Sequence, residues 1–300
     1  QPDSIWQVVT PKGTIHTEVV VNAGGLWARE VAALAGVFLP IFPMEHQYLI
    51  TEAVPELVAL DREIVHCLDF EGESYLRQER EGVVLGVYER DCRHWSVNGT
   101  PQDFGLELLA PDLERMLPKL EVAYQRYPCL ADVGIKQIIN GAMVFAPDGN
   151  PTIGPVPGLR NFYLACGVMA GFSQGAGVGM SVAEWIIEGE PSMDVFAMDC
   201  ARFGKWATKQ YTHAKTRENY QCRFQITFSN EELPAGRPLR TTPVYERLKV
   251  RNAVFGSAFG LEHALWFAPE GEEPYETPTF RRSNAFGPTG EECRAVRENV

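Results

Sequence analysis

Residues 167–179 read GVMAGFSQGAGVG, a run that places five glycines within thirteen positions. The run follows NFYLAC (161–166), which is strand-like, and precedes MSVAEWIIEG (180–189), which is helix-like. This order predicts a strand, a glycine-rich turn and a helix, and such a turn brings backbone N–H groups close to a ligand. Gly189 and Pro191 are expected to end the helix.

The beginning of the chain carries the same strand–turn–helix order. TEVVVNAGG (17–25) is a β-branched run that ends in glycines, and LWAREVAALAG (26–36) predicts a helix. Gly36 suits the position after that helix, where a left-handed backbone is common. A continuous apolar strand followed by a helix is typical of a parallel sheet that is buried on both faces.

The middle of the chain has a different pattern. HQYLITEAV (46–54) alternates, and SYLRQEREGVVLGVYE (74–89) predicts two strands joined by a turn at EREG. An amphipathic helix is expected from about Pro111 to Tyr127, and KQIINGAMVFAPDG (136–149) predicts another strand with a turn. These segments predict an antiparallel sheet with a helix packed against it.

The expected fold class is therefore α/β (α+β), with a nucleotide-binding type of domain interrupted by an antiparallel substrate domain. After it we expect an irregular module with weak periodicity and short helices, whose arginines (within 202–252) form salt bridges or face solvent rather than an anion site. The expected domains are 1–38 (first part of the nucleotide domain), 39–147 (substrate domain), 148–192 (return to the nucleotide domain) and 193–300 (irregular module).

Composition excludes several classes of function. The net charge of −12 argues against a nucleic-acid partner, because phosphate backbones are bound by basic surfaces. No run of eighteen apolar residues occurs, so neither a membrane helix nor a membrane partner is expected. The seven cysteines lack metal-ligand spacing, which argues against zinc and favours a reducing intracellular compartment. The chain begins with Gln1 and has no signal-peptide pattern, so we expect it to be cut from a longer protein.

The glycine run matches neither of the common phosphate-binding motifs. No Gly-Lys-Ser/Thr closes it, and its glycines do not follow the spacing of a dinucleotide fingerprint. The remaining use is a helix N-terminus, whose free N–H groups stabilise partial negative charge, such as that on the pyrimidine ring of a reduced flavin. The alternative, that these glycines only permit close packing of strand and helix, stays open.

Several motifs together resemble those of a known family. They are VVVNAGGLWAREVAALAG, MEHQYLIT, SYLRQEREG, APDGNPTIGPVPGLRNFYLACG, RFGKW and AGRPLR. Over essentially its whole length, the chain resembles the dimethylglycine dehydrogenase and sarcosine dehydrogenase family of D-amino-acid-oxidase-like flavoproteins. Within that family, HQY and YLRQE are more similar to the dimethylglycine enzymes.

The resemblance implies an FAD-dependent oxidative demethylase whose FAD-binding Rossmann-like domain is incomplete in this chain. Members of the family carry an N-terminal dinucleotide fingerprint, an upstream histidine that holds the flavin covalently, and a C-terminal domain that binds tetrahydrofolate. None of these is in this sequence. We therefore expect the chain to begin after the ADP-binding motif, and its last module to lead into the folate domain.

By resemblance, two segments of the chain contact FAD. The first is the turn after the initial strand and the second is the loop where the chain returns to the FAD domain. The alternative for the first segment is ordinary turn chemistry beside a buried tryptophan. The expected cofactor-binding residues are Ala23, Gly24, Gly25, Trp27, Val168, Met169, Ala170, Gly171, Phe172 and Ser173.

Two strands carry the expected chemistry. Side chains alternate along a strand, so His46 and Tyr48 share one face, and Tyr75 and Arg77 share one face of the next. By resemblance, His46 and Tyr75 match the catalytic pair of the family. Tyr48, on the same strand face as His46, is expected to contact the substrate. Arg77 suits a substrate carboxylate, although an ion pair with Glu79 or Asp69 would explain it equally well.

The resemblance implies hydride transfer from an N-methyl carbon of a methylated glycine to flavin N5, with dimethylglycine favoured over sarcosine. The alternative is a non-catalytic paralogue similar to the regulatory subunit of pyruvate dehydrogenase phosphatase. The resemblance also implies an electron-transfer flavoprotein as partner, with an oxygen-using oxidase as the other possibility. A bacterial cytoplasm or a mitochondrial matrix is the expected compartment.

Overall fold

The computed structural model describes residues 5–299. The described residues form two compact units: the first comprises residues 5–202 and 212–225, and the second comprises residues 203–211 and 226–299. No helix of the described residues is apolar over a length that could cross a membrane.

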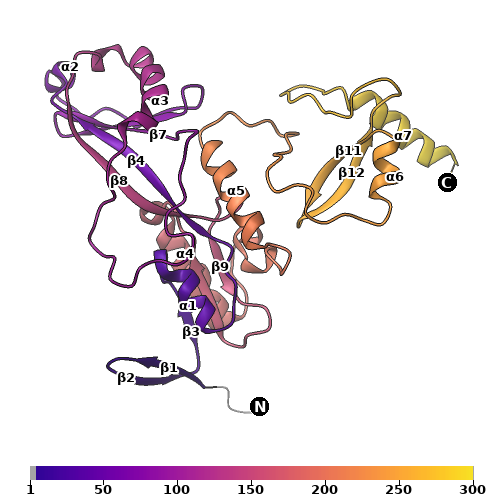
Figure 1. The fold of residues 1–300 in the computed structure, drawn as a ribbon, viewed down its shortest axis with the longest axis horizontal. Helices are drawn as coiled ribbons and strands as arrows, with labels where there is room; N and C mark the ends of the chain where they lie inside the picture. Colours follow the sequence, from indigo (N-terminus) through magenta and orange to yellow (C-terminus); the bar gives the residue numbers. More distant parts are fainter. Residues whose placement is uncertain (1–4, 300) are drawn as a thin grey trace. The chain divides into compact units, whose positions relative to one another are not determined.

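The strands and helices follow one another along the chain as shown in Figure 1. The strands are β1 (Trp6–Thr10), β2 (Gly13–Thr17), β3 (Val20–Asn22), β4 (Phe42–Thr51), β5 (Cys67–Asp69), β6 (Ser74–Glu79), β7 (Gly82–Val87), β8 (Ile135–Phe145), β9 (Thr152–Pro155), β10 (Phe162–Cys166), β11 (Ala253–Ala258) and β12 (Leu261–Phe267). The α-helices are α1 (Ala28–Leu34), α2 (Pro55–Val58), α3 (Leu113–Arg126), α4 (Gly171–Glu188), α5 (Lys209–Gln221), α6 (Tyr245–Val250) and α7 (Phe286–Asn299).

The larger sheet of the first unit is antiparallel and has the strand order β5-β6-β7-β4-β8. β6 and β7 form a hairpin whose two-residue turn includes Arg80 at a positive φ of 55°. β4 and β8 pair over nearly their whole lengths and are the long strands labelled in Figure 1. The predicted antiparallel sheet is therefore confirmed.

One face of this sheet packs against α3, which begins at its N-cap Asp112. Alternation places the apolar side chains of β4, β6 and β7 on this face, and burial of apolar surface stabilises the packing. Their core consists of Leu49, Val54, Leu76, Val83, Leu85, Val87, Met116, Leu120, Ala123 and Leu130. Four positions that alternate with these core residues lie on the opposite face of the sheet: His46, Tyr48, Tyr75 and Gly86.

The smaller sheet of the first unit has the order β3-β10-β9. β3 and β10 run parallel, with Leu164 opposite Asn22, and β9 is antiparallel to β10. The predicted parallel pairing is confirmed. The prediction of burial on both faces is wrong for β3, because Val21 is 42% exposed.

The glycine run lies mostly inside a helix, which corrects the sequence prediction. α4 already begins at Gly171, so only residues 167–170 form the turn. Glycines disfavour a helix by about 1 kcal/mol each, but Val178 and Val182 pack on Ile153 of β9, and this packing outweighs the propensity. Gly189 ends α4 in the left-handed conformation, as predicted.

The second unit is more regular than the sequence suggested. β11 and β12 form an antiparallel hairpin whose turn residues Phe259 and Gly260 both have positive φ. Trp266 of β12 packs with Val254 of β11 and with Ala285, just before α7. The expectation of an irregular module with short helices is thus wrong here, because the alternating stretch AVFGSAFGLEHALWF forms a hairpin and α7 has 14 residues.

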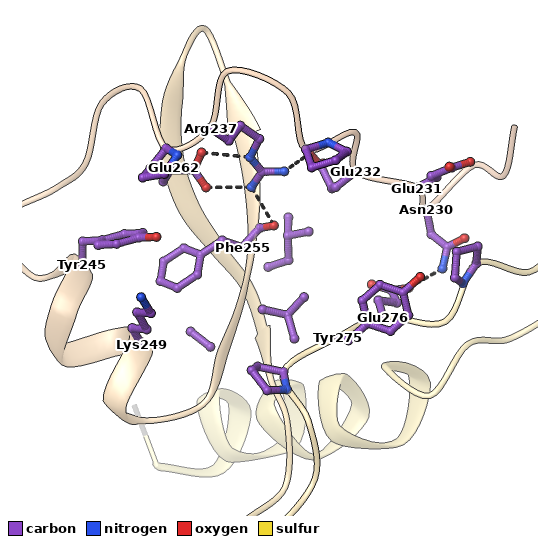
Figure 2. A pocket seen from close by; sticks show the side chains of 17 residues that line it. Asn230, Glu231, Glu232, Arg237, Tyr245, Lys249, Phe255, Glu262, Tyr275 and Glu276 are labelled. Carbon is purple, nitrogen blue, oxygen red and sulfur yellow. Dashed lines mark hydrogen bonds and ion pairs between the residues drawn. The ribbon is translucent and has the colours of Figure 1, made fainter. Parts of the chain in front are cut away.

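A pocket of about 640 Å³ lies over this hairpin, and Figure 2 shows the side chains that line it. Arg237 lies at its edge and donates to both carboxylate oxygens of Glu262, to Glu232 and to the carbonyl of Phe255. Two carboxylates therefore already neutralise this guanidinium. This agrees with the expectation that the arginines between residues 202 and 252 form salt bridges rather than an anion site.

The ion pair of Arg237 and Glu262 supports a stability prediction, since Glu262 is only 3% exposed. Arg237→Met should lower the free energy of unfolding of the hairpin by about 3–5 kcal/mol, because it leaves a buried carboxylate without its partner. Hydrogen exchange of the β11 and β12 amides measures this. Arg281→Met, at an exposed position, is the control, and equal exchange in both variants would contradict the prediction.

Candidate active site

A row of three residues crosses the face of the large sheet that lies opposite α3. Tyr48 on β4 lies opposite Gly86 on β7, and Gly86 lies opposite Tyr75 on β6. His46 is two residues from Tyr48 on β4, so it occupies the same face. The predicted proximity of His46 and Tyr75 is confirmed, because the His46 Nε2 and the Tyr75 hydroxyl are 2.9 Å apart.

Gly86 makes this contact possible. A Cβ at position 86 would overlap the Cζ and hydroxyl of Tyr75, so the ring of Tyr75 lies over the bare backbone of β7. Gly141 on β8 lies opposite His46, and a Cβ there would meet nothing within 4 Å. The two glycines thus have different consequences: Gly86 accommodates Tyr75, whereas Gly141 leaves open space beside His46.

Hydrogen bonds extend from the imidazole in both directions. The Tyr220 hydroxyl, at the end of α5, lies 2.9 Å from the His46 Nδ1 and donates to Oε2 of Glu89 at 2.7 Å. Because the only phenolic proton of Tyr220 points to Glu89, its oxygen accepts from Nδ1–H. Nε2 of the neutral ring then accepts from the Tyr75 hydroxyl. The four side chains form one directed chain, Tyr75→His46→Tyr220→Glu89.

Aromatic rings surround the histidine. Tyr88 stacks on His46 with ring centroids 4.6 Å apart, and Phe224 contacts both Tyr88 and Tyr75. Burial lowers the pKa of His46 to about 4 and raises the pKa of Tyr75 and Tyr220. Loss of hydration disfavours the charged form of each group. The imidazole is therefore a neutral base at physiological pH.

Glu89 links this chain of hydrogen bonds to charged side chains on the α3 side of the sheet. It is 1% exposed, and its Oε1 lies 3.8 Å from Arg115 of α3, which pairs more closely with Glu45 at 2.9 Å. Burial raises the pKa of Glu89, against the opposing effects of the Tyr220 hydroxyl and Arg115. A buried carboxylate with only a distant cation is well suited to take up a proton.

The two expected cofactor segments lie next to each other. The turn at Ala23–Gly25 follows β3, and residues 167–170 follow β10, so both leave the same carboxyl edge of parallel neighbours. The Cys166 thiol donates to the carbonyl of Asn22 and ties the two segments together. The side chain of Asn22 accepts from Gly24 N–H and donates to Ala28, which fixes the first turn.

The residues of the second segment point in different directions. Val168 packs into the core under α4, whereas Met169, like Tyr75, packs against the buried cluster that contains Tyr88 and Tyr220. Ala170 accepts a hydrogen bond from the Ser173 hydroxyl. Gly171 and Phe172, which open α4, are exposed. Met169 therefore brings the return loop next to the His46 face.

Two of the expected site residues already have partners within the protein. The indole N–H of Trp27 donates to the carbonyl of Pro101. Arg77 is exposed and forms an ion pair with Glu79 at 2.7 Å. The charge of Arg77 still acts on Tyr75, lowering its pKa against the larger effect of burial, and Tyr48 also lies close enough to influence that pKa. To bind the carboxylate of a substrate, Arg77 would have to give up its ion pair with Glu79.

Sequence reasoning missed Gly86, Tyr88, Glu89, Tyr220 and Phe224. The glycine inside GVVLGVY was a usable signal, because a glycine within a strand marks a close approach. Nothing in RENYQCRF distinguished Tyr220, which lies 174 residues from His46 in the sequence.

The carboxyl edge of the small sheet fits FAD. The N-terminus of α4 is exposed, and its backbone N–H groups and dipole suit the polar edge of a flavin ring. Cβ atoms at Gly25, Gly171 or Gly175 would meet no atom of the described chain, so the backbone is open to a ligand there. Among the described residues no group of three or more His, Cys, Asp or Glu side chains could hold a metal ion.

Comparisons with known proteins identify the family of the chain. Residues 1–185 match the model of the FAD dependent oxidoreductase family, and residues 188–242 match the FAD dependent oxidoreductase central domain. The chain is 40% identical to mitochondrial dimethylglycine dehydrogenase of Mus musculus, over all of this chain and 35% of that protein. It is 34% identical to human mitochondrial sarcosine dehydrogenase, over 89% of this chain and 29% of that protein. It thus spans about a third of the length of these relatives.

A solved structure supports the same fold. The L-proline dehydrogenase from P. horikoshii is 29% identical to this chain and superposes with a TM-score of 0.51. The match covers 65% of this chain and 50% of the other. The α/β fold class predicted from the sequence is confirmed by this similarity.

The overlap at Gly86 gives a direct test of the sheet face. Gly86→Ala should lower the free energy of unfolding by about 1–3 kcal/mol, because the ring of Tyr75 must move away from β7. Urea unfolding measures the change. Gly141→Ala, in the same sheet but facing open space, should be nearly neutral. Equal losses in the two variants would contradict the role of Gly86.

Acid should weaken the fold through His46. Its pKa is about 4 in the folded protein and about 6.5 unfolded, so the unfolded chain binds more protons between these values. The stability contributed by neutral His46 is complete above pH 6.5 and lost as the pH falls toward 4. Burial also lowers the pKa of His94 to about 4. His94 is present in both proteins compared below, so its contribution cancels.

From pH 7.5 to pH 4.5, the wild-type protein should lose about 1–2 kcal/mol more stability than His46→Asn, after allowance for partial exposure of the ring. Urea titrations at several pH values measure the two slopes. Parallel slopes would show that the imidazole is not held neutral by the fold.

Proposed function

The chain belongs to the FAD dependent oxidoreductase family, and from that premise we propose that the protein is an amine oxidoreductase that demethylates an N-methylated glycine. The observation that carries this proposal is the hydrogen-bonded pair of His46 and Tyr75, 2.9 Å apart on a desolvated face beside Met169 of the return loop. The relatives named for dimethylglycine and sarcosine support the substrate class.

The reaction requires an amine with a free lone pair, because a protonated amine cannot release hydride from its N-methyl carbon. The aromatic surroundings of His46 disfavour an ammonium ion. The oxygen of Tyr75 can take the proton of the substrate amine while its own proton passes to Nε2 of His46. Acid–base help of this kind is worth about 10²–10⁴ in rate.

FAD, when bound, supplies the acceptor for the hydride. The residues proposed to hold it are Ala23 to Gly25, Trp27 and the loop from Val168 to Ser173, which converge at the carboxyl edge of β3 and β10. The contribution of the protein is to orient the amine, exclude water and control its protonation state.

The finer substrate preference is also a proposal. Dimethylglycine is favoured over sarcosine, since the aromatic face of Tyr48, Tyr75 and Tyr88 suits a bulkier dimethylamine. Arg77 would bind the carboxylate of the substrate in place of Glu79, with Tyr48 beside it. Tetrahydrofolate as acceptor of the one-carbon unit and an electron-transfer flavoprotein as oxidant belong to the same proposal.

Reduction of bound FAD tests this function. Anaerobic addition of dimethylglycine should bleach the flavin absorbance, and His46→Ala or Tyr75→Phe should slow the bleaching by about ten-fold or more. His16→Ala, at an exposed position on β2, is the matched control and should leave the rate unchanged. Failure of both dimethylglycine and sarcosine to bleach the wild-type flavin would exclude the function and favour a non-catalytic regulatory role.

A further inference from the structure

We propose that Tyr220 and Glu89 form an internal proton path behind His46, with Glu89 as the group that stores the proton removed from the substrate amine. This inference rests on the proposed function and adds to it two residues outside the His46–Tyr75 pair. Tyr220 acts as a positioning and relay residue, and Glu89 is the end of the path.

The hydrogen bonds from Tyr75 to Glu89 are continuous. The heavy-atom distances along Tyr75, His46, Tyr220 and Glu89 are 2.9, 2.9 and 2.7 Å. Each hydroxyl can both donate and accept, and the imidazole accepts at Nε2 and donates at Nδ1, so one proton can move along every link in the same direction. Such a chain delivers a proton to a distant group without moving any heavy atom far.

The balance of the transfer is simple. The substrate N–H⁺ proton passes to the oxygen of Tyr75, the Tyr75 proton passes to Nε2 of His46, and the Nδ1 proton passes to the oxygen of Tyr220. The Tyr220 proton then passes to Oε2 of Glu89. The amine becomes neutral and Glu89 becomes a carboxylic acid, while Tyr75, His46 and Tyr220 end with the proton count they began with.

The carboxylate of Glu89 is also incompletely paired. Its Oε1 is buried and has no hydrogen-bond partner among the described residues. Arg115, its nearest cation, is 3.8 Å away and pairs more closely with Glu45. Uptake of a proton would relieve the cost of burying a carboxylate whose charge is only partly compensated.

Some groups around Glu89 favour its charged form, and others favour its neutral form. Tyr220 from α5 and Arg115 from α3 favour its charged form, whereas burial and Glu45 from β4 favour the neutral form. The charge of Glu89 also contributes to raising the pKa of Tyr88 and Cys92, on the segment after β7, and of Tyr75 on β6. The burial of the site favours the acid, and Tyr220 provides the contact through which the proton arrives.

The path also fixes the tautomer of His46 before substrate binds. With Tyr220 accepting from Nδ1–H, Nε2 is left without a proton and directed at Tyr75. Tyr220→Phe removes the acceptor, so the ring would favour the Nε2–H form and donate to Tyr75 instead. The base would then face away from the substrate.

The experiment uses the FAD-loaded protein and two variants, Tyr220→Phe and Glu89→Gln. Flavin reduction by saturating dimethylglycine is followed between pH 6 and 10. The wild-type rate should depend weakly on pH, because Glu89 takes the amine proton. Both variants should be slower by about ten-fold at neutral pH, and their rates should rise with pH as solvent takes over deprotonation.

Two spectroscopic measurements separate this role from a structural one. ¹⁵N NMR of the His46 ring should show an Nδ1–H tautomer in the wild type and a shift toward Nε2–H in Tyr220→Phe. Infrared difference spectra with ¹³C-glutamate labelling should show a protonated carboxylic acid after dimethylglycine is added, absent in Glu89→Gln. Trimethylglycine, whose nitrogen carries no proton, should not produce this band in the wild type.

Matched controls are Tyr124→Phe on α3, outside the path, and Glu73→Gln, a buried carboxylate that pairs with Lys119. Neither should change the pH profile or the tautomer. An unchanged profile, tautomer and infrared band in Tyr220→Phe and Glu89→Gln would overturn the proton path while leaving the proposed function intact. Absence of flavin reduction in the wild type would instead overturn the proposed function, and the tautomer would still report on Tyr220.

Discussion

The site depends on the register of three antiparallel strands. Tyr75 on β6, Gly86 on β7 and Tyr48 on β4 lie in one row, so the side chain of Tyr75 crosses a position without a side chain and reaches His46. A slip of one residue would turn each of these side chains toward α3 and expose the core on the other face. The packing of β4, β6 and β7 against α3 therefore enforces the geometry of the site as well as the stability of the sheet.

Burial then determines the chemistry of this face. Aromatic rings replace water around His46, so the imidazole stays neutral and its two nitrogens have fixed partners. The same loss of hydration keeps the phenols protonated, which lets each act as donor and acceptor. Glu89 is the one carboxylate in direct hydrogen-bond contact with this path in the described chain. A proton entering at Tyr75 thus has a single direction in which to move.

The sequence predicted the face but only part of the site. Alternation in HQYLIT and SYLRQE placed His46 and Tyr75 correctly, because the period of a strand is a local property. The helix start at Gly171 was missed because packing of Val178 and Val182 outweighs the low helix propensity of glycine. Tyr220 could not be found, since its contact with His46 depends on where α5 lies after a long excursion of the chain.

If the proposed function holds, the two sheets of the first unit contribute different parts of one reaction centre. Parallel neighbours β3 and β10 bring two loops to one carboxyl edge, where open glycine positions and the N-terminus of α4 suit a flavin. The antiparallel sheet supplies the base and its hydrogen-bonded partners, and Met169 packs against that cluster from the return loop. A cofactor held at the edge of the small sheet would therefore lie beside the residues that control the proton. The proposed function would thereby place hydride acceptance at one sheet and proton removal at the other.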